Sequence, residues 1–454
     1  MPEQDSAKKE LFETMPIPSA VSRMCVPMVV TSLVTVVYNM ADTYFVGLLG
    51  DPVQSAAVTL AYPVVLAFNA MNNLFGVGSS SLVSRSLGQG NTEQARNASA
   101  FGFWGAVFGG LLYSLVCTVF QAPLLGLLGA DASTRQATME YMYWVVTWGA
   151  APTILNVVQG QLVRSEGSAV HASIGTMSGC ILNIVLDPIF ILPWGLNMGA
   201  AGAGLATFIS NCVACLYFIV LAWTKHGRTV VSMDLRRLRH MPPAVMKNVL
   251  AVGVPAAIQN LLNVVGNTIL NNFTAAYGAV AVAAMGVSTR LIQIAQQISM
   301  GIAQGAMPLI SYNYASRDYR RMKGIIRFDM MVDLPAMAAM SAGYWIFAGP
   351  LVRLFLNNAE VVAYGSVFLR GACLAIPFLA VDFTCVFTFQ SVGMGGTTLV
   401  LALCRKLLLE IPLLFALNWA FPLYGLPYAQ PVTEVVLALL GLALLRRVLR
   451  EKGA

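Results

Sequence analysis

The sequence predicts an all-α integral membrane protein with twelve transmembrane helices in two six-helix lobes. Three observations lead to this prediction: the composition, a series of long apolar runs, and an internal repeat. The chain of 454 residues is 57% hydrophobic and only 10% charged, whereas about a quarter of the residues of a soluble protein are charged. A chain with so many apolar residues cannot shield them all from water, so we expect lipid to surround it. Its polar first fifteen residues lack the apolar core of a signal peptide, so we expect the first span to insert the protein.

Twelve apolar runs are long enough to cross about 30 Å of hydrocarbon. Gly and Pro interrupt several of them, which membrane helices tolerate where neighbouring groups satisfy the freed backbone. The runs lie at about residues 20–47, 53–84, 97–121, 136–158, 169–192, 201–223, 246–276, 281–312, 328–347, 361–382, 396–420 and 427–446. Because the number is even, both termini are expected on the same side of the membrane.

An internal repeat divides the chain into halves. The segment VVYNMADTYFVG (36–47) aligns with VVGNTILNNFTA (264–275) at an offset of 228 residues, which also takes Pro27 to Pro255. Each half holds six spans, so both halves enter the membrane in the same direction and are related by a pseudo-two-fold axis along its normal. We therefore expect an N-terminal lobe (1–223), a cytoplasmic linker (224–243) and a C-terminal lobe (244–454).

Basic residues cluster in loops that alternate with uncharged ones. The basic segments are 225–240, 317–327 and 446–452, while 192–204 and 421–431 contain no Lys or Arg. This is the positive-inside pattern, so the basic loops and both termini are predicted to be cytoplasmic. The net charge of +7 is thereby assigned to membrane orientation, and no nucleic-acid partner is expected.

Three carboxylates, Asp42, Asp187 and Asp382, are expected deep in the membrane, where a charge costs a few kcal/mol and usually has a function. Asp42 follows Tyr38 by four residues and Asn39 by three, so the three share one helix face. Asn183 and Asp187 share a face in the same way. Pro188 follows directly and frees a backbone carbonyl one turn earlier.

This combination of carboxylate, amide and carbonyl offers hard oxygen ligands for a small cation, or carboxyls that bind a proton. The glycine-rich segment GAAGAGLATFISN (199–211) can pack closely and supplies Thr207 as a further ligand. The alternative is that the aspartates only bond neighbouring helices. Asp382 has Thr384 as its sole polar neighbour in sequence, which leaves its role open.

Two glutamates in apolar runs are expected to have structural or no roles. Glu410 lies one turn after Lys406 and is predicted to pair with it. Glu434 is near a predicted helix start, where we expect it to be solvated.

Several chemical signatures are missing from the sequence. It contains no phosphate-binding GxxxxGK[ST] motif, no nucleophile elbow and no histidine cluster with metal-site spacing. The eight cysteines lie in apolar runs, and the CVAC of residues 212–215 is predicted to be a packing feature. The chain is therefore expected to be a transporter without a cofactor, and not an enzyme.

Together these motifs resemble the MATE (multidrug and toxic compound extrusion) family. The resemblance covers nearly the whole chain. It is carried by Pro27 with YNMADTYFVG, by QGQLVRSEG (159–167) followed by NIVLDPIFI, by GAAGAGLAT, and more weakly by FTFQSVGMGG (387–396) with the stretch from Arg405 to Pro412. It implies two lobes around a V-shaped cleft, alternating access, and export of small organic cations against H⁺ or Na⁺.

The resemblance also assigns residues. Asp42, Asn183, Asp187 and Thr207 match the family's N-lobe site for the coupling cation, H⁺ or Na⁺, and Pro27 matches a proline that bends the first helix. The expected substrate cleft includes Met28, Tyr38, Asn39, Asn156 and Asp382. The expected setting is the lipid bilayer of the inner (plasma) membrane, with the protein as a monomer.

One departure narrows the resemblance. A branch of the family uses a carboxylate on the seventh helix together with one on the tenth, but PAAIQNLLNVVGN (255–267) has no acid, and Asn263 stands near that place. This favours the N-lobe site and resembles the DinF-like branch.

Two other functions stay open. A flippase for lipid-linked oligosaccharides or a polysaccharide exporter of the same superfamily would need a basic central cavity, for which Arg290 and Arg370 are the candidates. A membrane receptor or channel would bind its ligand without exchanging protons or sodium.

Overall fold

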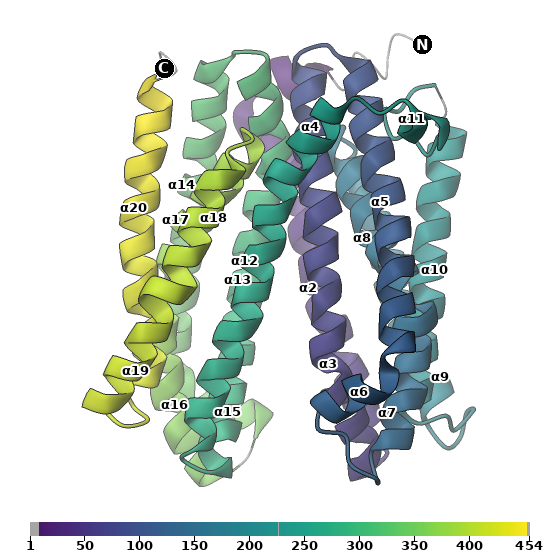
Figure 1. Cartoon of the computed structure of the whole chain (residues 1–454). Helices are drawn as coiled ribbons and strands as arrows, with labels where there is room; N and C mark the ends of the chain where they lie inside the picture. Colours follow the sequence, from purple (N-terminus) through teal and green to yellow (C-terminus); the bar gives the residue numbers. More distant parts are fainter. Residues whose placement is uncertain (1–8, 226, 357, 452–454) are drawn as a thin grey trace. The chain divides into compact units, whose positions relative to one another are not determined.

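The computed structural model describes residues 9–225, 227–356 and 358–451, and throughout this part of the chain the regular structure is helical (Figure 1). The first half contains η1 (Glu10–Thr14), α2 (Ile17–Gly47), α3 (Pro52–Asn72), η2 (Asn73–Val77), α4 (Gly78–Gly88), α5 (Thr92–Val119), α6 (Gln121–Leu127), α7 (Arg135–Met142), η3 (Tyr143–Trp148), α8 (Ala150–Ser165), α9 (Ala169–Ile191), α10 (Ala200–Thr224) and α11 (Arg236–Arg239). The second half contains α12 (Pro243–Ala275), α13 (Ala279–Ala315), α14 (Tyr319–Ile346), α15 (Ala348–Phe355), α16 (Ala359–Cys373), α17 (Ile376–Ser391), α18 (Gly395–Leu403), η4 (Cys404–Glu410), α19 (Ile411–Ala420), η5 (Leu426–Tyr428) and α20 (Ala429–Glu451).

The chain forms two compact units. Unit 1 consists of the segment up to Thr14 together with Val30–Ala257, and unit 2 consists of Met15–Val29 together with Ile258–Ala454. Helices α2 and α12 therefore each contribute to both units. In each helix the change of unit falls within a few residues of a proline, Pro27 in α2 and Pro255 in α12, the pair that the repeat relates. The predicted limits of the lobes, 1–223 and 244–454, stay a prediction.

The predicted apolar runs all fold as helices. Among the described residues, seven helices are long and apolar enough to cross a membrane, and two bent pairs, α14 with α15 and α16 with α17, pass the same test together. The remaining predicted runs, 136–158, 396–420 and 427–446, correspond to α7–η3–α8, to α18–η4–α19 and to α20. In the first two of these runs a π-helical segment interrupts the α-helix. The prediction of an all-α membrane fold is confirmed.

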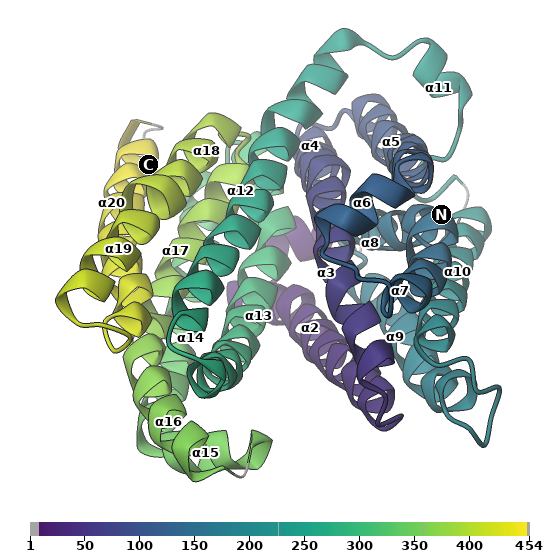
Figure 2. The same ribbon diagram turned by 60° about the horizontal axis from the view of Figure 1, so that its bottom comes forward.

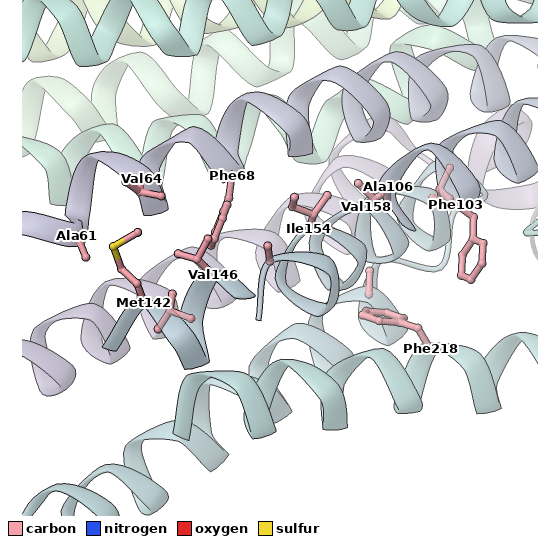
Figure 3. Packing of buried hydrophobic residues seen from close by; sticks show 14 of the residues in the cluster. Ala61, Val64, Phe68, Phe103, Ala106, Met142, Val146, Ile154, Val158 and Phe218 are labelled. Carbon is pink, nitrogen blue, oxygen red and sulfur yellow. The ribbon is translucent and has the colours of Figure 1, made fainter. Parts of the chain in front are cut away.

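The core of unit 1 is made of apolar side chains from helices α3, α5, α7, α8 and α10. Figure 3 shows Phe68, Met142, Ile154 and Phe218 in this core, where each is at most 2% exposed. Unit 2 has a core of its own around α13, α14, α16 and α17. Each fully buried side chain of this size contributes roughly 1.5–3 kcal/mol when it leaves water, although in lipid the gain comes from packing rather than from transfer.

Helices α9 and α10 lie side by side in both ribbon views and approach closely (Figures 1 and 2). A Cβ on Gly179 would stand 3.1 Å from Ser210 O, and one on Gly202 would stand 2.6 Å from Phe190 O, so only glycine fits at Gly202. Gly199 precedes α10 with a φ of +58°, and the Ala200 N–H after it donates to Gln54 Oε1 at 2.8 Å. The glycines let α10 approach α9 closely, as the glycine-rich sequence predicts, and the hydrogen bond to Gln54 ties the start of α10 to α3.

Candidate cation-binding site

The two acids predicted to act together, Asp42 and Asp187, belong to the same unit. Asp42 lies on the part of α2 that is in unit 1, and Asp187 lies on α9 immediately before Pro188. Asp187 is completely buried. Asp42 is half-buried, and its Oδ1 atom is buried without a hydrogen-bond partner in the described chain. The two carboxyls are close enough to interact electrostatically.

Asn183 joins Asp187 to α10. With its amide nitrogen turned towards Asp187, the side chain donates to Asp187 Oδ2 at 3.0 Å and accepts from the Thr207 N–H at 3.0 Å and hydroxyl at 3.2 Å. With the amide reversed, the nitrogen donates to Thr207 Oγ1 at 3.2 Å and the oxygen faces the carboxylate. Asn183 therefore has one orientation that suits a carboxylate as acceptor and one that would need a cation between the two oxygens.

Two tyrosines complete this cluster. The Tyr38 side chain lies near that of Thr207 and near both acids. Tyr141, on α7, is buried and also lies near Asp42, Asp187 and Tyr38. The sequence reasoning did not select Tyr141, because nothing in its own segment distinguishes it from a packing aromatic.

A line of amides extends the cluster towards α8. Asn156 Nδ2 donates to Asn211 Oδ1 at 3.1 Å, and Asn211 Nδ2 donates to the Thr207 carbonyl at 2.8 Å. Asn156 is 5% exposed and its own Oδ1 has no partner in the described chain. Thr207 thus stands at the centre of a polar network that reaches three helices around it.

No basic side chain pairs with Asp42 or Asp187 in the part of the chain that the structure describes. An ionised carboxylate without a cationic partner is costly in a low-dielectric surrounding. Two such groups side by side lower this cost by binding a proton or a small cation. The cluster is therefore chemically suited to taking up and releasing positive charge.

The other predicted residues lie elsewhere. Asn39 is exposed, and its backbone carbonyl accepts from the Thr43 hydroxyl at 3.0 Å. Met28 is half-buried and belongs to unit 2. Pro27 lies inside α2, which continues through it as one helix. The structure thus brings together Asp42, Asn183, Asp187, Thr207, Tyr38 and Asn156; the functional roles of all these residues stay predictions.

Asp382 stands in a different setting, in unit 2. Arg405 Nη2 donates to Asp382 Oδ2 and, at 2.6 Å, to Glu434 Oε2. All three side chains are buried. The expectation that Glu434 is solvated is wrong, because Arg405 from η4 supplies the charge that allows this glutamate to be buried in α20. The predicted pair between Lys406 and Glu410 is confirmed, at 2.7 Å.

Two further buried acids were missed by the sequence reasoning. Asp329 and Asp333 lie one turn apart on α14, and they accept hydrogen bonds from Thr384 at 3.1 Å and from Ser299 at 2.6 Å. Both are at most 1% exposed. Their i,i+4 spacing within the predicted run 328–347 is the signal that would have found them.

The structure defines a polytopic helical membrane protein in which Asp42 and Asp187 of one unit have no cationic partner among the described residues, whereas Asp382 and Glu434 of the other share Arg405. The family model described as MatE matches residues 27–189 and 255–416. This chain belongs to the MatE family. That membership confirms the expectation of a membrane transporter rather than an enzyme.

Similar proteins agree with this assignment over nearly the whole chain. The multidrug export protein MepA of Staphylococcus saprophyticus is 31% identical over 428 residues, which are 94% of this chain and 93% of the relative. A crystal structure of a MATE protein in complex with MaL6 has a TM-score of 0.91 at 24% identity and covers 98% of this chain and 99% of that one. An outward-facing multidrug resistance MATE family transporter has a TM-score of 0.88 at 25% identity, covering 95% and 96% of the two chains.

Proposed function

We propose that this protein is a multidrug efflux antiporter that exports organic cations in exchange for H⁺ or Na⁺ by alternating access. Membership of the MatE family and similarity to a multidrug export protein support the export of drugs. The observation that carries the exchange is the pair Asp42 and Asp187, one half-buried and one fully buried carboxyl for which the described chain supplies no cationic partner. Such a pair needs a positive charge from outside the protein.

The same requirement couples the ion to the drug. A coupling ion at Asp42 and Asp187 stabilises the conformation in which these acids are most buried, and an organic cation stabilises the conformation that exposes them. Each ligand shifts the equilibrium only by its difference in affinity for the two conformations. By linkage the effect is reciprocal, so each ion bound weakens drug binding by the factor by which the drug weakens ion binding.

The hydrogen bonds around Asn183 favour H⁺ as the coupling ion. In the orientation that satisfies both ends of the amide, its nitrogen donates to Asp187 and its oxygen accepts from Thr207. Neither the amide oxygen nor the Thr207 lone pairs then need a metal ion. A proton is taken up by a carboxyl oxygen alone, of which Asp42 Oδ1 is without a partner in the described residues.

Na⁺ is the second candidate, and the same side chain gives it a route. If the Asn183 amide reverses, its oxygen faces Asp187 and the nitrogen donates to the Thr207 hydroxyl at 3.2 Å. Asp42, Asp187 and the Asn183 oxygen would then be the ligands of the ion, since hard cations prefer carboxylate and carbonyl oxygens.

Flipping of lipid-linked sugars receives less support. Arg290 and Arg370, the residues considered for a basic cavity, are both exposed. Arg370 Nε donates to the Trp345 carbonyl at 3.1 Å and its guanidinium lies 5.7 Å from the Trp345 ring. The deeply buried Arg405 is occupied by two carboxylates of its own unit.

Transport in liposomes tests the proposal. Purified protein is reconstituted with a fluorescent organic cation, and proton and sodium gradients are imposed separately. We expect the proton gradient to drive transport, and we expect Asp187→Asn to reduce that transport by at least tenfold because an amide cannot bind the proton. Asp51→Asn is the matched control: Asp51 is an exposed acid that caps α3, and asparagine caps equally well.

The outcomes separate the candidates. Transport driven only by sodium would select Na⁺. If Asp187→Asn and Asp42→Asn both transport with unchanged ion dependence, the two acids are not the coupling site. If neither gradient moves the organic cation, the antiport proposal fails.

We further propose that the protein is a monomer in the inner (plasma) membrane with both termini in the cytoplasm. The alternation of basic and uncharged loops supports this orientation. Single cysteines placed in 192–204 and in 317–327 of a cysteine-free variant test it. A membrane-impermeant maleimide added to intact cells should label the first position and leave the second unlabelled; the reverse result would invert the topology.

A further inference from the structure

A large groove lies in unit 2 at the beginning of α14 and the end of α20. Its volume is about 1130 Å³, which exceeds the roughly 300–1,000 Å³ of a typical small-molecule site. In Figure 1 the first residues of α14 and the last residues of α20 lie near the C label. Figure 2 shows α14, α17 and α20 grouped together. None of the residues assigned to ion coupling lines this groove.

Polarity changes along α14 within the groove. Arg320, Lys323 and Arg327 follow one another at helical spacing, and Met331 and Leu334 continue the same lining further along the helix. At 1.5 Å per residue, Arg320 and Leu334 are about 21 Å apart along the axis. The groove wall is thus basic near the start of α14 and apolar further along that helix.

Helix α20 shows the same order in the opposite chain direction. Leu442 and Leu445 line the groove before Arg446 on α20, and Leu449 lines it three residues after Arg446. The groove is lined by the first half of α14 and the last turns of α20. The basic residues of both helices therefore lie at the same end of the groove. Met331 and Leu334 are 58% and 40% exposed, so the apolar part of the wall is open to an apolar occupant.

The charge at this end is one-sided. Five basic residues line the groove against a single acid, Asp318, whose side chain caps α14 by accepting from the Arg321 N–H at 2.9 Å. Within the described residues, the charged groups of Arg320, Lys323, Arg327 and Arg446 form no ion pair or hydrogen bond. They are therefore available to an anion from outside the chain.

We propose that this groove binds an anionic phospholipid, with its phosphate among Arg320, Lys323, Arg327 and Arg446 and its acyl chains against Met331, Leu334 and Leu442. Basic groups at the end of a membrane helix attract anionic headgroups, and long basic side chains reach towards the interface while their stems cover apolar surface. A soluble anion would use only the basic end and leave the apolar wall uncovered. The combination of both fits an amphiphile with a negative head.

Native mass spectrometry of the full-length protein tests this inference. The delipidated protein, in an uncharged detergent, is titrated with phosphatidylglycerol and, separately, with phosphatidylcholine. The variant Arg320→Gln/Lys323→Gln/Arg327→Gln should bind the first phosphatidylglycerol about 100-fold more weakly, because each basic residue near an anionic headgroup contributes roughly fivefold. Phosphatidylcholine should bind weakly throughout.

A matched control removes three exposed charges elsewhere. Arg236→Gln/Arg239→Gln/Lys247→Gln alters exposed basic residues of unit 1 and should change the affinity less than threefold. Leu334→Trp, which fills the apolar wall without changing charge, should weaken binding at least fivefold and reports on the acyl chains. Only variants that remain monodisperse are compared.

Three results would overturn the proposal. An equal loss in both triple variants would mean diffuse attraction to a basic surface. Equal affinity for phosphatidylcholine and phosphatidylglycerol would mean an apolar contact without headgroup recognition. Displacement of the lipid by glycerol 3-phosphate at similar concentrations would mean a site for a soluble anion.

Discussion

Two clusters of carboxyls, one in each unit, have different kinds of partner. In unit 1, Asp187 accepts from Asn183 in one orientation of that amide, and the uncharged Tyr38 and Tyr141 lie near Asp42 and Asp187. In unit 2, Asp382 and Glu434 share the guanidinium of one arginine, Arg405. The first group lacks a permanent positive charge, and the second contains one.

This difference separates a group that can exchange ions from one that holds a structure together. An internal guanidinium cannot leave the protein, so Asp382 and Glu434 always have a cationic hydrogen-bond donor beside them. Uncharged donors lower the cost of a carboxylate only in part, and under the proposed function an ion from solution supplies the missing positive charge at Asp42 and Asp187. The predicted role of Asp382 in the substrate cleft stays open, and its ion pair makes a structural role the simpler interpretation.

The largest effect is expected from removing the shared arginine. Arg405→Gln leaves two buried carboxylates without a cation, and breaking a buried ion pair in this way costs about 3–5 kcal/mol. The measurement is the temperature at which half of the detergent-solubilised protein leaves the monodisperse peak. Arg370→Gln, which removes an exposed arginine beside Trp345, is the control and should change this temperature little.

A compensating variant makes that prediction sharper. Arg405→Gln/Asp382→Asn/Glu434→Gln removes all three charges together and should recover much of the lost stability. If the triple variant is no more stable than Arg405→Gln, the loss comes from packing of the guanidinium rather than from uncompensated charge.

A smaller effect compares one aspartate from each unit. Asp382→Asn removes a charge-assisted hydrogen bond to Arg405 and should cost about 1.5–3 kcal/mol. Asp187→Asn removes a carboxyl that has no cationic partner, and should leave the stability unchanged or raise it by up to about 1 kcal/mol. Thermal unfolding of the two variants side by side gives the comparison; equal destabilisation by both would remove the distinction between the units.

The smallest effect concerns the donors around Asn183. Thr207→Val removes the hydroxyl that hydrogen-bonds the Asn183 amide, and this should weaken ion binding by about 1 kcal/mol. Transport should then depend roughly fivefold more weakly on the ion gradient. Thr207→Ser keeps the hydroxyl and is the control. Wild-type ion dependence in Thr207→Val would show that the Thr207 backbone N–H alone orients Asn183.

The sequence by itself determined the solvent, the helical class and half of the candidate site. The apolar composition indicates that the surroundings are lipid. In lipid the backbone polar groups must bond within the chain, which strongly favours helices. Asn183 and Asp187 could be paired in advance because a helix places residues four apart on one face. The pair Lys406 and Glu410 was predictable for the same local reason.

Only the tertiary structure decided which polar groups from different helices meet. Arg405 is 23 and 29 residues away from its partners, and Asn156 is 55 residues from Asn211. A sequence shows that a polar side chain stands in an apolar run, but its partner depends on the rotation and depth of the neighbouring helix. Those quantities are set by packing, here by contacts such as those of Gly199 and Gly202 that fix α10. Whether a carboxyl has an arginine beside it, as Asp382 has, or no cationic partner among the described residues, as Asp187 has, is therefore decided by how the helices pack.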